Sequence, residues 1–190
     1  MRPFDFIILF FSFIYALALT HLLLAATFMI RYRRKITFSP AHAVWMFDAL
    51  LVLTANWISL WDFHTTAAIS IWVVAAGFAL SVNQYLVCAL VSPEFEHDDD
   101  FDLRAFHDRQ GHAYIAAFAM LLLISVAINF AAGYALGLQK WTGENAIVLA
   151  MLPATLIPLF VRHQLVQVAG AIVLAILIVA YLLTYYPVLQ

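Results

Sequence analysis

The sequence predicts an all-α protein, a polytopic membrane helical bundle with six transmembrane helices and both termini outside (N-out/C-out). Of its 190 residues, 66% are apolar and only 11% are charged, whereas soluble domains carry about 45–50% apolar and about 25% charged residues. The apolar residues form six long stretches, and the cations lie between alternate pairs of them. Too few polar side chains remain to cover a water-soluble globule. A soluble domain, a disordered chain and a nucleic-acid-binding protein are therefore excluded.

Six stretches reach, or nearly reach, the length of about 20 apolar residues that a bilayer span needs. The first, third and fourth exceed this length, so we expect them to tilt. The fifth is the shortest and contains Pro153 and Pro158, which mark a candidate kink because each proline removes a backbone donor. Residues 1–190 are thus expected to form a single six-helix domain. The six stretches are Phe4–Ile30, His42–Trp61, Thr65–Val91, His112–Leu138, Asn145–Val161 and Leu165–Pro187.

The first stretch is expected to be an uncleaved anchor helix. Residues 16–18 (Ala-Leu-Ala) resemble the small-residue site at which signal peptides are cleaved. However, the region before the stretch carries only Arg2, which Asp5 offsets, and the apolar run continues beyond this site to Ile30.

The charges of the loops predict the orientation, because Lys and Arg are retained on the cytoplasmic side. Arg2 and Lys140 would lie on the outer side, and the other seven of the nine cations would lie on the inner side. The loops after the first, third and fifth stretches are therefore expected in the cytoplasm. The seven inner cations are Arg31, Arg33, Arg34, Lys35, Arg104, Arg109 and Arg162.

Few polar side chains lie within the stretches, and four of them form a candidate cluster. With a helix rise of about 1.5 Å per residue, all four would lie on the order of 9–14 Å below the inner interface. Short loops should make the first three spans neighbours. A carboxylate beside an imidazole favours its charged form, so the cluster could relay protons or bind a cation. The alternative is a polar network that fixes helix register. The four residues are His21, Asp48, Asn83 and Gln84.

Small and polar residues recur at helical spacing on the third and fourth stretches. Small residues let helices approach closely, whereas a pore lining would need more hydroxyl and charged groups along a whole span. These residues are therefore predicted to mediate helix packing, with a GxxxG at the end of the fourth stretch. They are Gly77 and Ser81, and then Ser125, Asn129, Gly133 and Gly137.

An acidic cytoplasmic loop is expected at about residues 92–111, with Asp102–Gly111 as a candidate short interfacial helix before the fourth span. His107, Asp108 and His112 are weak candidates for metal ligands. Asp108 and His112 are four residues apart, but the five-residue separation of the two histidines matches no standard zinc pattern. We therefore predict no metal site. Whether the protein binds a cofactor is left undecided, and His21 is the one candidate that could bind a cofactor as its single axial ligand.

Three segments resemble a group of short multi-pass bacterial membrane proteins of unassigned function. They are FDFIILFFSFIYALALTHLL at the start, NWISLWDF at the end of the second stretch, and FDLRAFHDRQGHAY before the fourth. This resemblance covers about a quarter of the chain. It implies a multi-pass bundle in the bacterial inner membrane, and no activity, cofactor or catalytic residue.

Enzymatic activity is the least supported class, because the sequence has no GxSxG, HExxH or Walker lysine motif. We expect a non-catalytic subunit or scaffold of a larger membrane assembly. Its partners would be the lipid bilayer and either further copies of the chain or other membrane subunits. The alternative is a small proton- or cation-conducting channel or transporter that uses the buried cluster.

Overall fold

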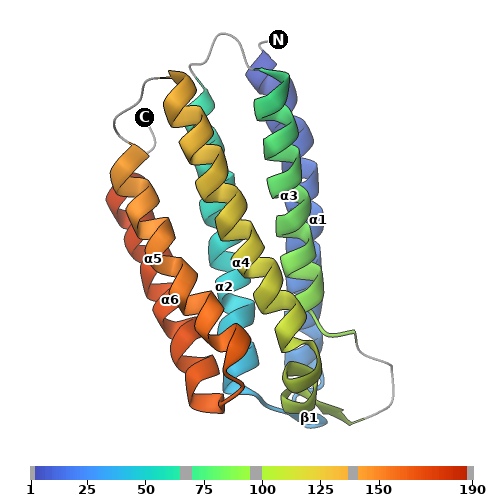
Figure 1. Cartoon of the computed structure of the whole chain (residues 1–190). Coiled ribbons are helices and arrows are strands. Elements are labelled where there is room, and N and C mark those ends of the chain that lie inside the picture. Colours follow the sequence, from blue (N-terminus) through green and yellow to red (C-terminus); the bar gives the residue numbers. More distant parts are fainter. Residues whose placement is uncertain (1–2, 65–69, 95–99, 137–140, 188–190) are drawn as a thin grey trace.

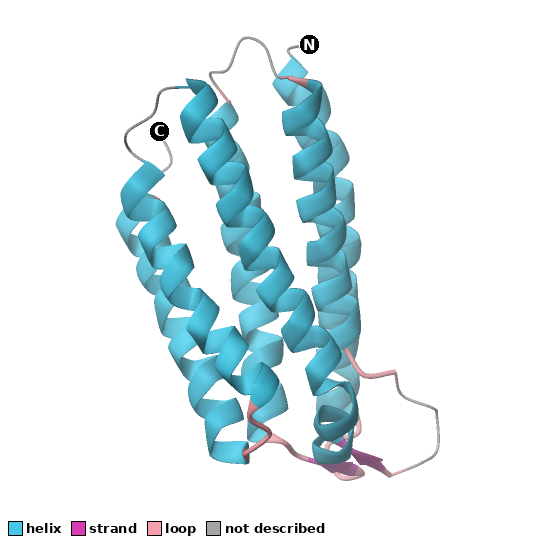
Figure 2. Cartoon of the chain, in the orientation of Figure 1, coloured by secondary structure: helices cyan, strands magenta, loops and turns pink. Residues whose placement is uncertain are grey.

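A computed structural model describes residues 3–64, 70–94, 100–136 and 141–187, and these residues form a bundle of long helices (Figure 1). The predicted all-α class is confirmed. Figure 2 shows how little of the described chain lies outside helices. The helices are α1 (Pro3–Arg31), α2 (Pro40–Ser59), α3 (Ile71–Val91), α4 (Leu103–Leu136), α5 (Trp141–Phe160) and α6 (Gln164–Tyr185). The shorter elements are β1 (Ile36–Thr37), the 3-10 helix η1 (Leu60–Phe63) and β2 (Phe101–Asp102).

Five of these helices are long and apolar enough to cross a membrane, as far as the described residues go: α1, α2 with η1, α3, α4 and α6. The apolar part of α5, Asn145–Phe160, is shorter. Large apolar side chains cover the outside of the bundle; Phe13 on α1 is 66% exposed and Ile176 on α6 is 61% exposed. Such a surface suits acyl chains, so the fold is that of a membrane-embedded helical bundle. Six crossings and their orientation remain predictions.

Capping side chains explain where two helices begin. The Asp102 carboxylate accepts hydrogen bonds from the backbone N–H groups of Arg104 (2.8 Å) and Ala105 (3.2 Å), which are free at a helix start. Helix α4 therefore begins at Leu103, well before the expected His112, and the expected interfacial helix is the first part of α4. The hydroxyl of Ser39 accepts from the His42 N–H at the start of α2 (3.4 Å).

Successive helices run in opposite directions, so α1 begins and α6 ends at the same end of the bundle (Figure 1). Helix α2 packs extensively against α6 and also contacts α1, α3 and α4. The first three helices are neighbours, as expected, but the main partner of α2 is the last helix. Its inward side chains, including Trp45 and Ala49, are fully buried.

The loops at the opposite end are joined by a two-residue parallel pairing, Ile36 with Phe101 and Thr37 with Asp102. This end also holds the start of α4 and the turn from α5 to α6 (Figure 1). The seven cations of the predicted inner loops therefore lie together at one end of the bundle, which we call the basic end. The end that holds the start of α1, η1 and the end of α6 is the terminal end.

Candidate functional site

The structure gives three of the four predicted cluster residues separate partners. The Nε2 atom of His21 is hydrogen-bonded to the Tyr85 hydroxyl, at 3.1 Å, between α1 and α3. Asn83 donates to the Ala117 carbonyl of α4 at 3.0 Å. Gln84 accepts a hydrogen bond from Asn56 of α2 at 2.9 Å.

The helix register explains why Gln84 pairs with Asn56 rather than Asp48. Asn56 lies 16 residues after the start of α2 (40 to 56), and Gln84 lies 7 residues before the end of α3 (84 to 91). At about 1.5 Å per residue these separations are about 24 Å and about 10 Å. Helix α3 therefore ends about 14 Å short of the level at which α2 begins. Asp48, about 12 Å along α2, lies near the level of that end.

Asp48 is fully buried, and neither carboxylate oxygen has a hydrogen-bond partner among the described residues. His42 and Trp45 precede it at three-residue steps on the same helix, and their ring nitrogens are also buried without partners in the described chain. The His42 ring lies edge-on to Tyr114 of α4, with 6.3 Å between centroids. The hydroxyl of Tyr114 is hydrogen-bonded to Nδ1 of His107. Polar groups thus lie between Asp48 and the basic end.

The residues predicted for helix packing have different surroundings. Gly77 lies against the Phe11 ring of α1, where an added Cβ would lie 2.9 Å from a ring carbon. The buried Ser81 donates to the Gly77 carbonyl at 2.8 Å. Ser125 and Asn129 line a pocket at the terminal end. Gly133 lies in α4, its surroundings are not described, and Gly137 lies outside the described residues.

Helix α5 continues through both prolines. Because Pro158 has no N–H, the Ala154 carbonyl lacks the usual helical donor. Gly170 of α6 lies against this point; an added Cβ would be 2.3 Å from Pro158 Cγ and 2.8 Å from the Ala154 oxygen. Among the described glycines this is the closest approach between helices. The sequence reasoning missed it, because Gly170 has no small partner at GxxxG spacing.

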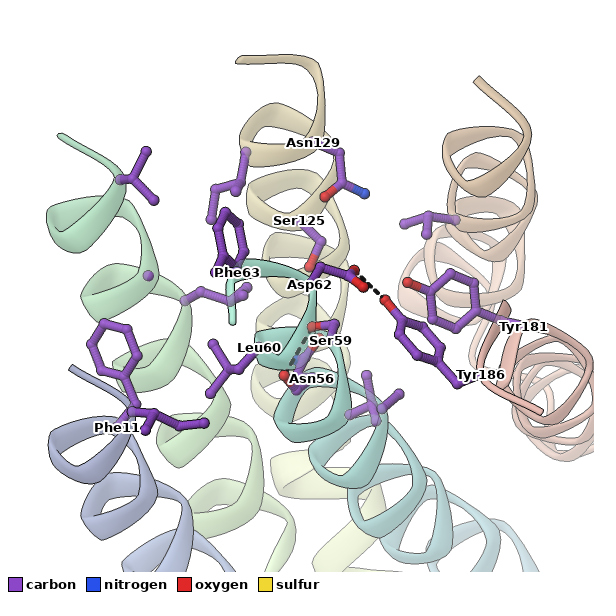
Figure 3. Close-up of a pocket in the computed structure, with 18 of the residues that line it drawn as sticks. Phe11, Asn56, Ser59, Leu60, Asp62, Phe63, Ser125, Asn129, Tyr181 and Tyr186 are labelled. Carbon is purple, nitrogen blue, oxygen red and sulfur yellow. Dashed lines mark hydrogen bonds between the residues drawn. The ribbon is translucent and has the colours of Figure 1, made fainter. Parts of the chain in front are cut away.

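A mostly apolar pocket of about 110 Å³, the terminal pocket, lies between all six helices near the terminal end (Figure 3). Its walls are aliphatic and aromatic, and amide, hydroxyl and carboxylate groups lie among them. Apolar pockets with a few convergent polar groups are typical binding sites for small molecules. The polar residues are Asn56, Ser59, Asp62, Ser125, Asn129, Tyr181 and Tyr186.

One hydrogen bond closes a side of this pocket. The Tyr186 hydroxyl donates to the Asp62 carboxylate at 2.5 Å and so joins η1 to the segment that follows α6 (Figure 3). Burial, the neighbouring Tyr181 and the Asp62 carboxylate raise the pKa of Tyr186 above its ordinary value. The sequence reasoning did not select Asp62. Its signal was a lone acid between Trp61 and Phe63, just past a predicted span.

A second pocket, of about 440 Å³, lies at the basic end, and we call it the basic pocket. It contains the three weak metal candidates, but within the described ranges no group of three or more His, Cys, Asp and Glu residues could hold a metal ion. His107 is buried beside Tyr114, while Asp108 and His112 are exposed. The polar residues that line it include Arg104, His107, Asp108, His112, Arg162 and Gln167.

Comparisons with protein-family models, with curated proteins and with solved structures found no match. Any assignment of function must therefore come from the contacts described above.

Proposed function

We propose that this protein resides in the bacterial inner membrane, with the basic end in the cytoplasm, as a non-catalytic subunit or scaffold of a larger membrane assembly. The observation that carries the proposal is the use of polar side chains within the bundle. The His21–Tyr85 and Asn56–Gln84 bonds, and the bond from Asn83 to α4, all cross between helices. Bonds of this kind hold helices in register. They do not present a reactive group to a substrate.

The exposed face of α1 supports a role in assembly. Phe6, Phe10, Phe13 and Leu17 are 50–68% exposed, and they follow one another at steps of four, three and four residues. This is the spacing of the apolar seam along which two helices pack. The seam fits a helix of a second copy or of another membrane subunit.

Purification in a mild detergent tests this proposal. We expect the native chain to purify with a stoichiometric membrane partner or as a defined oligomer. The double variant Phe13→Ala and Leu17→Ala should lose that partner. Phe38→Ala removes a similarly exposed apolar side chain that lies outside the helices, and it serves as the control. A strictly monomeric native particle, or equal losses in both variants, would contradict the proposal.

Asp48 favours a second candidate function, the transfer of protons or of a small cation. Buried carboxylates in membrane helices commonly mark ion or proton pathways. Of the four predicted cluster residues, Asp48 is the one that supports this candidate. His21, Asn83 and Gln84 are hydrogen-bonded to residues outside the cluster. The route towards it would begin at the basic pocket and pass His107, Tyr114 and His42.

Flux into liposomes that contain the purified protein tests this second candidate. We expect Asp48→Asn to abolish any proton or cation flux that the native protein supports. Glu94→Gln changes an exposed carboxylate that follows α3 and does not line the basic pocket, and it is the matched control. Equal flux through the native protein and Asp48→Asn would exclude the transfer function.

A further inference from the structure

The basic pocket brings together residues from distant parts of the chain. Arg104 comes from the first turn of α4, Arg162 from the turn between α5 and α6, and Gln164 and Gln167 from the first turn of α6. The pocket encloses about 440 Å³ and is open to solvent, because both arginine side chains are exposed. Its size and polar lining suit a small hydrophilic group.

The pocket has an excess of positive charge. Within the described parts of the chain, the guanidinium groups of Arg104 and Arg162 have no carboxylate or carbonyl partner. Asp108 is the carboxylate that lines the pocket beside them, and His112 adds an exposed imidazole. Arginine forms strong paired hydrogen bonds with phosphate oxygens. The lining thus holds two arginines and one carboxylate, which favours an anionic ligand.

The start of α6 adds backbone donors to the same pocket. A helix N-terminus leaves N–H groups free and carries a partial positive charge, which favours anions. His163 precedes α6 and provides no side-chain cap. The first helical N–H groups, those of Gln164 and Leu165, have no acceptor among the described residues, whereas Val166 and Gln167 donate to the His163 carbonyl.

Gln167 adds a buried acceptor. Its amide nitrogen donates to two carbonyls at the end of α5, those of Pro158 (2.5 Å) and Val161 (2.8 Å). Because carbonyls only accept, these bonds fix which end of the amide is nitrogen. The other end, Oε1, is buried and has no partner in the described chain, and the side chain is only 6% exposed. A donor such as a hydroxyl group would satisfy this acceptor.

We propose that the basic pocket binds a phosphate ester that carries a free hydroxyl group. The phosphate would contact Arg104, Arg162 and the start of α6, and the hydroxyl would donate to Gln167 Oε1. Two sources share this chemistry: the headgroup of a phospholipid such as phosphatidylglycerol, and a soluble polyol phosphate such as glycerol 3-phosphate. The site is independent of the assembly role proposed above, because none of its residues lies on the exposed seam of α1.

Binding to the full-length protein in a neutral detergent tests the proposal. The probes are phosphatidylglycerol and glycerol 3-phosphate, with phosphatidylcholine and glycerol as controls, and the readouts are titration and the shift in melting temperature. We expect one of the first two probes to bind. Arg104→Gln and Arg162→Gln should each weaken binding about fivefold, since a cation near a membrane surface contributes about 1 kcal/mol. Arg34→Gln removes an exposed cation at the same end but outside the pocket, and should leave affinity unchanged.

The outcomes separate the two sources and can overturn the proposal. Binding of phosphatidylglycerol alone identifies a lipid site, and binding of glycerol 3-phosphate identifies a soluble ligand. Phosphatidylmethanol and methyl phosphate lack the free hydroxyl and should bind more weakly than the glycerol esters. Equal affinity for the methyl and glycerol esters would overturn the role of Gln167. No binding of either probe above its control, or an equal loss with Arg34→Gln, would overturn the site itself. The melting temperatures of the ligand-free variants check that they fold.

Discussion

Gly170 sets the distance between α5 and α6, and we predict that Gly170→Ala destabilises the bundle. An added methyl group would meet the Pro158 ring and the Ala154 carbonyl, both held by helix backbone. Overpacking of this kind costs about 1–3 kcal/mol. Thermal unfolding in detergent should therefore show a lower melting temperature.

Gly111→Ala is the matched control for this prediction. Gly111 also lies within a helix and is buried, but an added Cβ there would lie 3.4 Å from the His107 ring, an ordinary contact. Alanine favours helix by up to about 1 kcal/mol relative to glycine. The control should keep or raise the melting temperature. A Gly170→Ala protein as stable as the Gly111→Ala protein would show that α5 and α6 can separate at no cost.

Tyr186 should keep its proton at pH values where exposed tyrosines lose theirs. Because its pKa is raised in the folded protein, the stability that the neutral phenol provides is complete below about pH 10, the ordinary tyrosine value, and is lost as the pH rises further. Absorbance titration of native protein and Tyr186→Phe measures this. The difference between the two curves should be a single phenol that ionises above about pH 10. A difference curve centred at the ordinary value would contradict the buried contact with Asp62.

At the scale of the elements, hydropathy located the six helices because each must bury or present an apolar surface along its length. The same pattern did not locate the helix ends. Asp102, which begins α4, and Ser39, which accepts from the His42 N–H at the start of α2, are short polar residues outside the apolar runs. Nor does hydropathy encode where one helix lies along another. Because α3 ends before the level at which α2 begins, Gln84 lies level with Asn56 rather than with Asp48.

The cap of α4 can be tested by removing its carboxylate. Asp102→Ala should free the N–H groups of Arg104 and Ala105 and cost about 1 kcal/mol, the usual value for an N-cap. The first turn of α4 should then exchange its amide hydrogens faster, as hydrogen-exchange mass spectrometry would show. Asp108→Ala, at an exposed position farther along the same helix, is the control. Unchanged exchange in the Asp102 variant would mean that packing alone holds this turn.

At the scale of the whole molecule, loop charge predicted that seven of the nine cations share one end, and the structure places those seven there. It did not predict the basic pocket, because the pocket depends on how three turns converge. Arg104 and Arg162 are 58 residues apart (104 to 162). The sequence does not indicate a role for Gln167, because that role depends on the hydrogen bond from its amide nitrogen to the end of α5. A single polar residue within an apolar stretch can be recognised in the sequence. Which distant residues meet in one pocket depends on how the helices are arranged.

The orientation of the bundle in the membrane can be tested by labelling introduced cysteines. If positive loops stay in the cytoplasm, residue 33 at the basic end and residue 64 at the terminal end must lie on opposite sides of the membrane. We expect a membrane-impermeant thiol reagent to label His64→Cys in sealed right-side-out vesicles, and to label Arg33→Cys only after the vesicles are opened. The native protein is the control, because Cys88, the single cysteine of the chain, is buried. Labelling of Arg33→Cys alone in sealed vesicles would reverse the orientation. Labelling of both variants would mean that the bundle does not cross the bilayer, and would remove the physical basis for treating Asp48 as a group at membrane depth.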